Sequence, residues 1–182
     1  MGIKEEKTPL FLYLYKNIGV KMKVKDIALI AILTAITFVV EQILSYVPLV
    51  QLTVFFLLLF SKKLKTIKTL IIIVVHVLLD NLVSGAFNIL YVIFMTIGYT
   101  SIPLFTNVLF KGKEKVIELS FIGLICSFIY SWILIIPGCI IFEMNFIDYL
   151  KGDIIFEIGL ALSSFITTLI LYKPLERVFN KV

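Results

Sequence analysis

The chain has 182 residues, of which 60% are hydrophobic and 16% charged, and its mean hydropathy is +1.08. A soluble domain has about half apolar and about a quarter charged residues, so this composition excludes a soluble globular protein and predicts an integral membrane protein. The net charge of +5 is what cationic cytoplasmic loops produce, so it gives no support to nucleic-acid binding.

The first segment, residues 1–21, is predicted to be an N-terminal extension. Its apolar part, Thr8–Val20, is too short to span a bilayer and is not followed by a signal-peptide cleavage site. Two interpretations stay open. The segment lies along the inner membrane surface as an interfacial helix, or Met22 is an alternative start and the segment is dispensable.

The first membrane span follows Lys23 and Lys25 and runs from Ile27 to Val47. Its length of about twenty residues is enough to cross a hydrocarbon core of roughly 30 Å. The next apolar run, Leu49–Phe60, is only twelve residues long. Because the basic stretch Ser61–Lys68 has to return to the cytoplasm, we predict that this run crosses as well.

The long apolar stretch Leu70–Phe110 exceeds one helix and is interrupted around Asp80–Asn88, which predicts two helices joined by an outward-facing turn. The remaining predicted elements are a fifth span at Val116–Phe142, an outer loop at Glu143–Asp153 and a sixth span at Ile154–Tyr172.

The distribution of cations tests this topology. Of 17 Lys and Arg residues, 16 fall in the predicted inner segments and only Lys151 falls outside. This bias predicts an all-α, multi-pass protein of the cell membrane, with six transmembrane helices and both termini cytoplasmic. We expect residues 22–182 to form a single domain, since no internal repeat and no long linker is present.

Three alanines of the first span, Ala28, Ala31 and Ala35, lie on closely related faces of the helix. Small residues at this spacing let a second helix approach closely in lipid. The pattern is compatible with packing inside the protein and with an exposed surface on which another membrane subunit docks.

Three carboxylates, Glu41, Asp80 and Glu157, lie within apolar runs. At that depth a carboxylate is costly unless it meets water, a partner or a ligand. An interfacial belt of polar and aromatic side chains accounts for part of the pattern, and a ligand pocket accounts for the rest. The predicted substrate-binding residues are Glu41, Gln42, Asp80, Asn81, Asn88, Tyr91, Tyr130, Trp132 and Glu157.

The sequence contains no recognisable enzyme, cofactor or ATP-binding motif, so we expect neither catalytic residues nor a cofactor. The single histidine, His76, has no second His or Cys with which to form a metal site. A hydrogen bond to Asp80, one helical turn away, is the expected alternative. Cys126 and Cys139 are interpreted as small core residues.

The chain resembles the substrate-binding S-component of an energy-coupling factor (ECF) vitamin transporter, over roughly residues 22–175. The resemblance rests on the size, the six predicted spans and the opening MKVKDIALIAILTAITFVV with its two alanines four residues apart. The segments YVPLVQLTVFFLLLF and LLDNLVSGAFNILYV are loosely similar to members assigned to the uptake of a thiamine-precursor pyrimidine.

The resemblance implies a vitamin-like substrate and a docking role for Ala28, Ala31 and Ala35. Their partner would be a transmembrane coupling subunit that is linked to two ATPase subunits. It also implies an outward-facing pocket built with the loops Ser45–Gln51, Asp80–Asn88 and Glu143–Asp153. The single histidine argues against a metal substrate. The acidic groups favour a small amine-bearing heteroaromatic ligand, which aromatic side chains would also bind.

Two other function classes are compatible with the sequence. A non-transporting scaffold, similar to the rod-shape-determining membrane proteins, would use the alanines for partner packing and would need no outer pocket. An integral-membrane enzyme without a recognisable motif is the third class. The cluster of acidic and aromatic residues favours transport over the scaffold, and the absence of enzyme motifs disfavours the third class.

Overall fold

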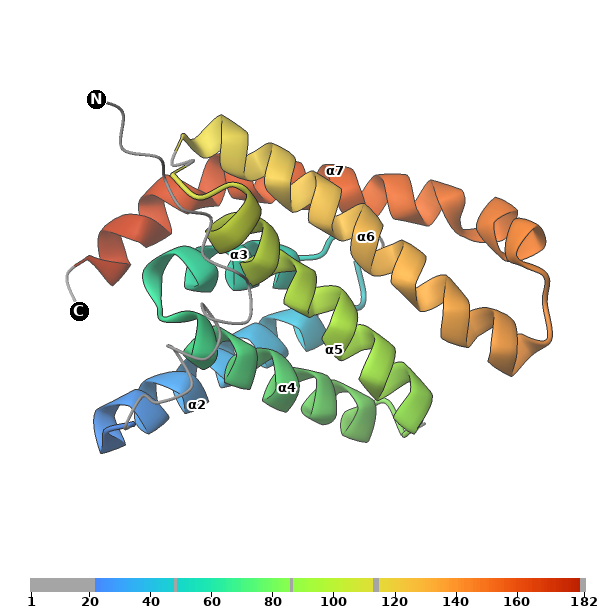
Figure 1. Ribbon diagram of the computed structural model, residues 1–182, viewed down its shortest axis with the longest axis horizontal. Coiled ribbons are helices and arrows are strands. Elements are labelled where there is room, and N and C mark those ends of the chain that lie inside the picture. The colour runs from blue at the N-terminus through green and yellow to red at the C-terminus, as the bar shows by residue number, and fades with distance from the viewer. Residues whose placement is uncertain (1–21, 48, 86, 113–114, 181–182) are drawn as a thin grey trace, which may run out of the picture.

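The computed structural model describes residues 22–47, 49–85, 87–112 and 115–180, and the predicted N-terminal extension 1–21 lies outside them. The described residues form helices without any strand, which confirms the all-α prediction (Figure 1). The elements are α2 (Val24–Leu44), α3 (Thr53–Lys63), α4 (Thr66–Val83), α5 (Ile89–Leu104), the π-helix η1 (Phe105–Leu109), α6 (Val116–Phe142) and α7 (Phe146–Phe179).

The short helix α3 forms the centre of the bundle. Every residue from Thr53 to Ser61 is buried, and α3 contacts α2, α4, α5, η1, α6 and α7. A helix that is apolar on all sides is stable only when other elements surround it, and the sequence VFFLLLF leaves no polar face for solvent. The large buried side chains Phe55, Leu57 and Phe60 therefore form the middle of the core.

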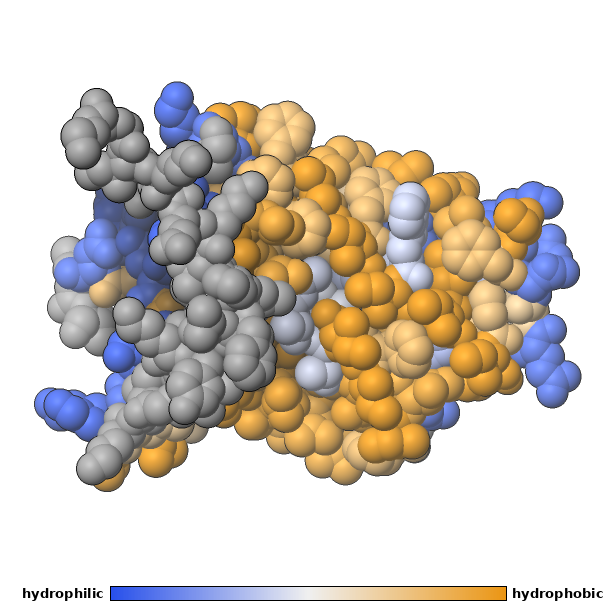
Figure 2. Space-filling view, viewed as in Figure 1, coloured by the Kyte–Doolittle hydropathy of each residue, from blue (hydrophilic) through white to orange (hydrophobic). Residues whose placement is uncertain are grey.

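Five helical segments are long and apolar enough to cross a membrane, namely α2, α4, α5 with η1, α6 and α7. Figure 2 shows an apolar band between two hydrophilic ends of the molecule, as expected for a multi-pass membrane protein. Helix α3 has only 11 residues, whereas a helix that crosses the membrane needs roughly 20. Its length is about 16 Å. The six-span topology and the cytoplasmic termini stay predictions.

Ion pairs join the helices at the basic end of the molecule. Lys68 at the start of α4 lies 2.6 Å from Asp26 at the start of α2. Lys63 at the end of α3 lies 2.8 Å from Glu176 near the end of α7. Lys62 also donates a hydrogen bond to the backbone carbonyl of Thr106 in η1. The helix ends that the charge pattern predicts to be cytoplasmic are thus held together.

The break inside the predicted stretch Leu70–Phe110 is confirmed. Helix α4 ends at Val83, the turn includes Gly85 with a φ of +74°, and Asn88 caps α5 by accepting a hydrogen bond from the backbone N–H of Leu90. Glycine adopts this left-handed backbone without steric cost, and asparagine is a favoured N-cap residue.

The predicted outer loop Glu143–Asp153 is wrong over most of its length, because α7 already begins at Phe146. The acidic residue Asp148 lies in the first turn of α7, where the positive end of the helix dipole stabilises a carboxylate. The polar residues that the sequence analysis assigned to a loop therefore form the first turns of α7, which begins before the apolar run of the predicted sixth span. Helix α7 also continues past the predicted span end at Tyr172 to Phe179.

The hairpin of α6 and α7 packs through small residues that the sequence analysis did not single out. Gly123 of α6 lies so close to α7 that a Cβ there would be 3.0 Å from Ser164 Oγ and 3.3 Å from Thr168 Oγ1. Ser127, one turn further along α6, is also buried. Small side chains at four-residue spacing bring these two helices into close contact.

We expect Gly123→Leu to destabilise the protein by about 1–3 kcal/mol, because the added side chain has no space between α6 and α7. The measurement is thermal unfolding in detergent. Gly152→Leu is the matched control, since a Cβ at Gly152 meets no atom within 4 Å and leucine favours helix over glycine. An equal loss of stability in both variants would contradict the close packing at Gly123.

Candidate functional site

A cavity of about 300 Å³ lies beyond the N-terminal end of α3. It is lined by the end of α2, by residues 45, 47 and 49–52 of the connecting segment, by Asp80 of α4 and by Leu160 of α7. The cavity exists because α3 begins only at Thr53, which leaves space inside the bundle that the longer helices enclose. Of the three loops predicted to build the pocket, Ser45–Gln51 contributes several lining residues and Asp80–Asn88 contributes Asp80, whereas no residue of Glu143–Asp153 lines it.

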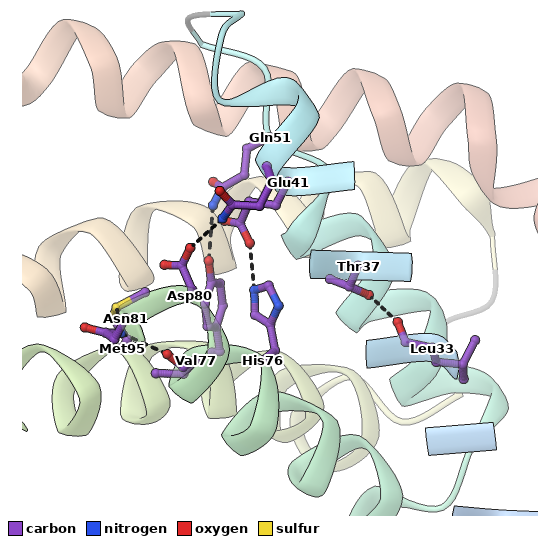
Figure 3. A network of polar contacts seen from close by, with 11 residues as sticks. Leu33, Thr37, Glu41, Gln51, His76, Val77, Asp80, Asn81 and Met95 are labelled. Atoms are coloured by element: carbon purple, nitrogen blue, oxygen red, sulfur yellow. Dashed lines mark hydrogen bonds and ion pairs between the residues drawn. The ribbon is translucent and has the colours of Figure 1, made fainter. Parts of the chain in front are cut away.

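Two pairs of side chains connect α2 with α4 at the wall of this cavity. Glu41 Oε2 lies 2.7 Å from His76 Nε2, and Asp80 Oδ1 accepts a hydrogen bond of 3.1 Å from Gln42 Nε2. Glu41 and Gln42 are neighbours on α2, while His76 and Asp80 are one turn apart on α4, so the two pairs lie side by side (Figure 3). The expected contact between His76 and Asp80 is replaced by the contact with Glu41.

Gln51 holds the connecting segment in place through two hydrogen bonds. Its backbone N–H donates to Ser163 Oγ of α7 at 3.0 Å, and its side-chain Nε2 donates to the Tyr99 hydroxyl of α5 at 3.2 Å. Its Oε1 is buried and has no hydrogen-bond partner. Because buried carbonyl oxygens are nearly always satisfied, this atom is a candidate acceptor for a ligand in the cavity.

Aromatic rings lie behind Gln51. The Tyr99 ring stacks on the Tyr130 ring with a centroid distance of 4.1 Å, and the His76 ring meets Tyr99 edge-on at 6.0 Å. His76 and Tyr99 have no exposed surface. Polar and aromatic contacts therefore connect α2, α4, α5 and α6, from Glu41 through His76 and Tyr99 to Tyr130.

The lining residues favour ligands that donate hydrogen bonds. Glu41, Asp80 and Gln51 contribute oxygen atoms, and no Lys or Arg lines the cavity in the part of the chain that the structure describes. Carboxylates and amide oxygens bind amines and other N–H groups well. The remaining lining is aliphatic, contributed by residues such as Leu44, Val50 and Leu160, which suits the apolar part of a small organic molecule.

Of the nine predicted substrate-binding residues, the structure places Glu41, Gln42 and Asp80 at the cavity. Tyr130 is one layer removed, behind Tyr99. Glu157 and Trp132 form a separate pair, in which the indole Nε1–H donates to Glu157 Oε2 at 3.1 Å. Trp132 is 54% exposed and Glu157 only 1%, and neither lines the cavity.

The other three predicted residues have local structural contacts. Asn81 donates to the backbone carbonyl of Val77 and contacts the Met95 sulfur, Asn88 caps α5, and Tyr91 lies beside Tyr149 of α7. None of the three lines the cavity.

The predicted docking residues Ala28, Ala31 and Ala35 are all exposed on the outer side of α2. The opposite side of the helix, with Ile30 and Leu33, is buried, chiefly against α4. Within the described residues no helix therefore covers the three alanines, and their role in docking another membrane helix stays a prediction.

Gln51 and Tyr99 were missed as members of the site, and His76 was expected to have a different partner. A usable signal existed for Gln51, because it is a polar residue next to the central apolar run and within a predicted loop. Tyr99 carried no such signal, since a single tyrosine in an apolar helix does not reveal which neighbour its hydroxyl meets.

No group of three or more His, Cys, Asp or Glu residues that could hold a metal ion occurs among the described residues. Comparison of the chain with protein-family models, curated proteins and solved structures found no match. The candidate function therefore rests on the cavity and its contacts.

We expect His76→Leu to lower the free energy of unfolding by about 1–3 kcal/mol, because Glu41 loses its buried partner. The double variant Glu41→Leu/His76→Leu should lose less than the sum of the two single variants, since it removes the polar pair together. Chemical or thermal unfolding in detergent measures both effects.

Lys173→Ala is the control for this cycle. Lys173 pairs with Glu176 at 3.0 Å, but its side chain is 58% exposed, so we expect a change of about 0–1 kcal/mol. Additive losses in the Glu41 and His76 variants would show that the two side chains do not stabilise each other.

Proposed function

We propose that this protein is the substrate-binding component of an ECF-type importer and that it binds a small amine-bearing ligand, such as a heteroaromatic vitamin or vitamin precursor. The observation that carries the proposal is the cavity at the end of α3, where Glu41, Asp80 and Gln51 contribute acceptor groups beside aliphatic side chains. Intramembrane carboxylates at a cavity typically mark a ligand or ion pathway.

The cavity also weighs against a non-transporting scaffold. Its volume of about 300 Å³ is in the range of small-ligand sites, and its lining combines aliphatic walls with a few converging polar groups. A scaffold gains nothing from this arrangement, because unpaired buried oxygens such as Gln51 Oε1 cost stability. A ligand that donates hydrogen bonds would offset that cost.

Energy for uphill import would have to come from a partner, since the sequence contains no ATP-binding motif. Exposed Ala28, Ala31 and Ala35 place small side chains on the outer side of α2, which favours close approach of a coupling subunit's helix. Two ATPase subunits would complete the transporter. The same helix contributes Glu41 and Gln42 to the cavity, so α2 would take part both in ligand binding and in docking of the partner.

Native mass spectrometry of the detergent-purified protein tests the binding function. We expect a stoichiometric, amine-bearing small molecule to co-purify and to be released on denaturation. A protein that is empty, and whose melting temperature does not respond to a panel of vitamins and their precursors, would contradict a binding function and favour the scaffold.

We expect Ala31→Leu and Ala35→Leu to abolish uptake and co-purification with a coupling subunit, while ligand binding is unchanged. The larger side chain would keep a partner helix at a distance, but it would not touch the cavity. Uptake by cells and ligand binding by the purified variants are the two measurements. Val74→Phe is the control, since it enlarges an exposed side chain on a different helix.

A loss of binding together with uptake in the alanine variants would mean that this surface is needed for the fold. Unchanged uptake would contradict docking through α2.

A further inference from the structure

We infer that the cavity is built for a monovalent organic cation and that Asp80, rather than Glu41, is the counter-ion of this cation. The inference deepens the proposed binding function and rests on it. It follows from two observations on the described residues: which charged side chains lie at the cavity, and which hydrogen-bond or ion-pair partner each of these side chains has.

Glu41 is already compensated. Its Oε2 lies 2.7 Å from Nε2 of His76, and His76 is completely buried. The Glu41 carboxylate is therefore already engaged by a basic side chain. A ligand that displaced His76 would leave a buried imidazole without its partner, which is costly.

Asp80 has only a neutral partner. Its Oδ1 accepts from the amide of Gln42, and within the described residues no Lys, Arg or His nitrogen lies within 4.0 Å of its carboxylate. The negative charge of ionised Asp80 therefore has no cationic side chain beside it. A single positive charge on the ligand would balance it, whereas a neutral ligand would not and an anion would be repelled.

The backbone adds to the same preference. Helices α2 and α4 both end at the cavity, with Glu41 and Asp80 close to their C-termini, and neither helix has a basic residue in its last turn. The C-terminal end of a helix carries a partial negative charge that favours cations. The buried Oε1 of Gln51, which has no partner, contributes a further acceptor for an N–H group of the cation.

Three isosteric probes separate charge from shape. Benzamidine, benzamide and benzoate are planar molecules of nearly the same size, and at neutral pH they are cationic, neutral and anionic. All are small enough for a cavity of about 300 Å³. Binding to the full-length protein in detergent is measured by equilibrium titration and by the shift in melting temperature.

We expect benzamidine to bind and to raise the melting temperature, and benzamide and benzoate to bind at least tenfold more weakly. In Asp80→Asn the affinity for benzamidine should fall by about thirtyfold or more, while the preference over benzamide is lost. Asparagine can still accept the hydrogen bond from Gln42, so this variant keeps the contact between α2 and α4. Glu41→Gln should lose less affinity than Asp80→Asn.

Asp148→Asn is the matched control, because it makes the same substitution at an acidic residue that is 56% exposed in its side chain and lies outside the cavity. Benzamide binding as tightly as benzamidine, failure of all three probes to bind, or an equal loss in Asp80→Asn and Asp148→Asn would each overturn the inference. A co-purified ligand that is neutral or anionic would also overturn it, while the binding function itself would stand.

Discussion

The burial of α3 is the constraint on which the rest of the structure depends. A helix without a polar face needs a full set of neighbours, and α2, α4, α5, α6 and α7 supply them. Because α3 is short, the longer helices extend beyond its N-terminal end, and the space between them there is not filled by α3. The core and the cavity are thus two consequences of one sequence feature, the brief apolar run between Gln51 and Lys62.

Polar contacts then determine how α2 lies on the bundle. At the basic end it is joined to α4 by Asp26 and Lys68, and near its other end by the pairs of Glu41 with His76 and of Gln42 with Asp80. Between these contacts Ile30 and Leu33 are buried together with Thr34 and Thr37, whose hydroxyls donate to backbone carbonyls of α2 itself. Directional contacts in a low-dielectric interior specify one register where apolar packing alone would allow several.

The helical class and most helix positions could be predicted, because apolar runs and charge bias are strong signals in membrane proteins. The break between α4 and α5 was visible in Asp80–Asn88, where polar residues and a glycine meet. The start of α7 was not, since Asp148 and Asp153 look like loop residues to a hydropathy argument. A helix that extends beyond the bilayer can carry such residues in its first turns.

The candidate site could be predicted only in part, for a geometric reason. The position of a residue along a predicted span gives its approximate depth in the membrane. Depth alone was enough to single out Glu41 and Asp80. Direction around the helix axis decides which neighbour a side chain meets, and it depends on packing that one sequence does not reveal. Glu157 has a depth that suited the predicted pocket, yet it turns toward Trp132. His76 shares a face with Asp80 and still meets Glu41.

The shortness of α3 has an electrical consequence. If the cavity opens to water, the insulating layer beneath it is only about as thick as α3, about 16 Å for its 11 residues, which is roughly half of a 30 Å hydrocarbon core. The membrane potential would then fall mostly across that thin layer, and its field there would be about doubled. One elementary charge moved through 100 mV corresponds to about 2.3 kcal/mol. If the proposed cation crosses the membrane at this place, it passes most of that potential within the length of α3.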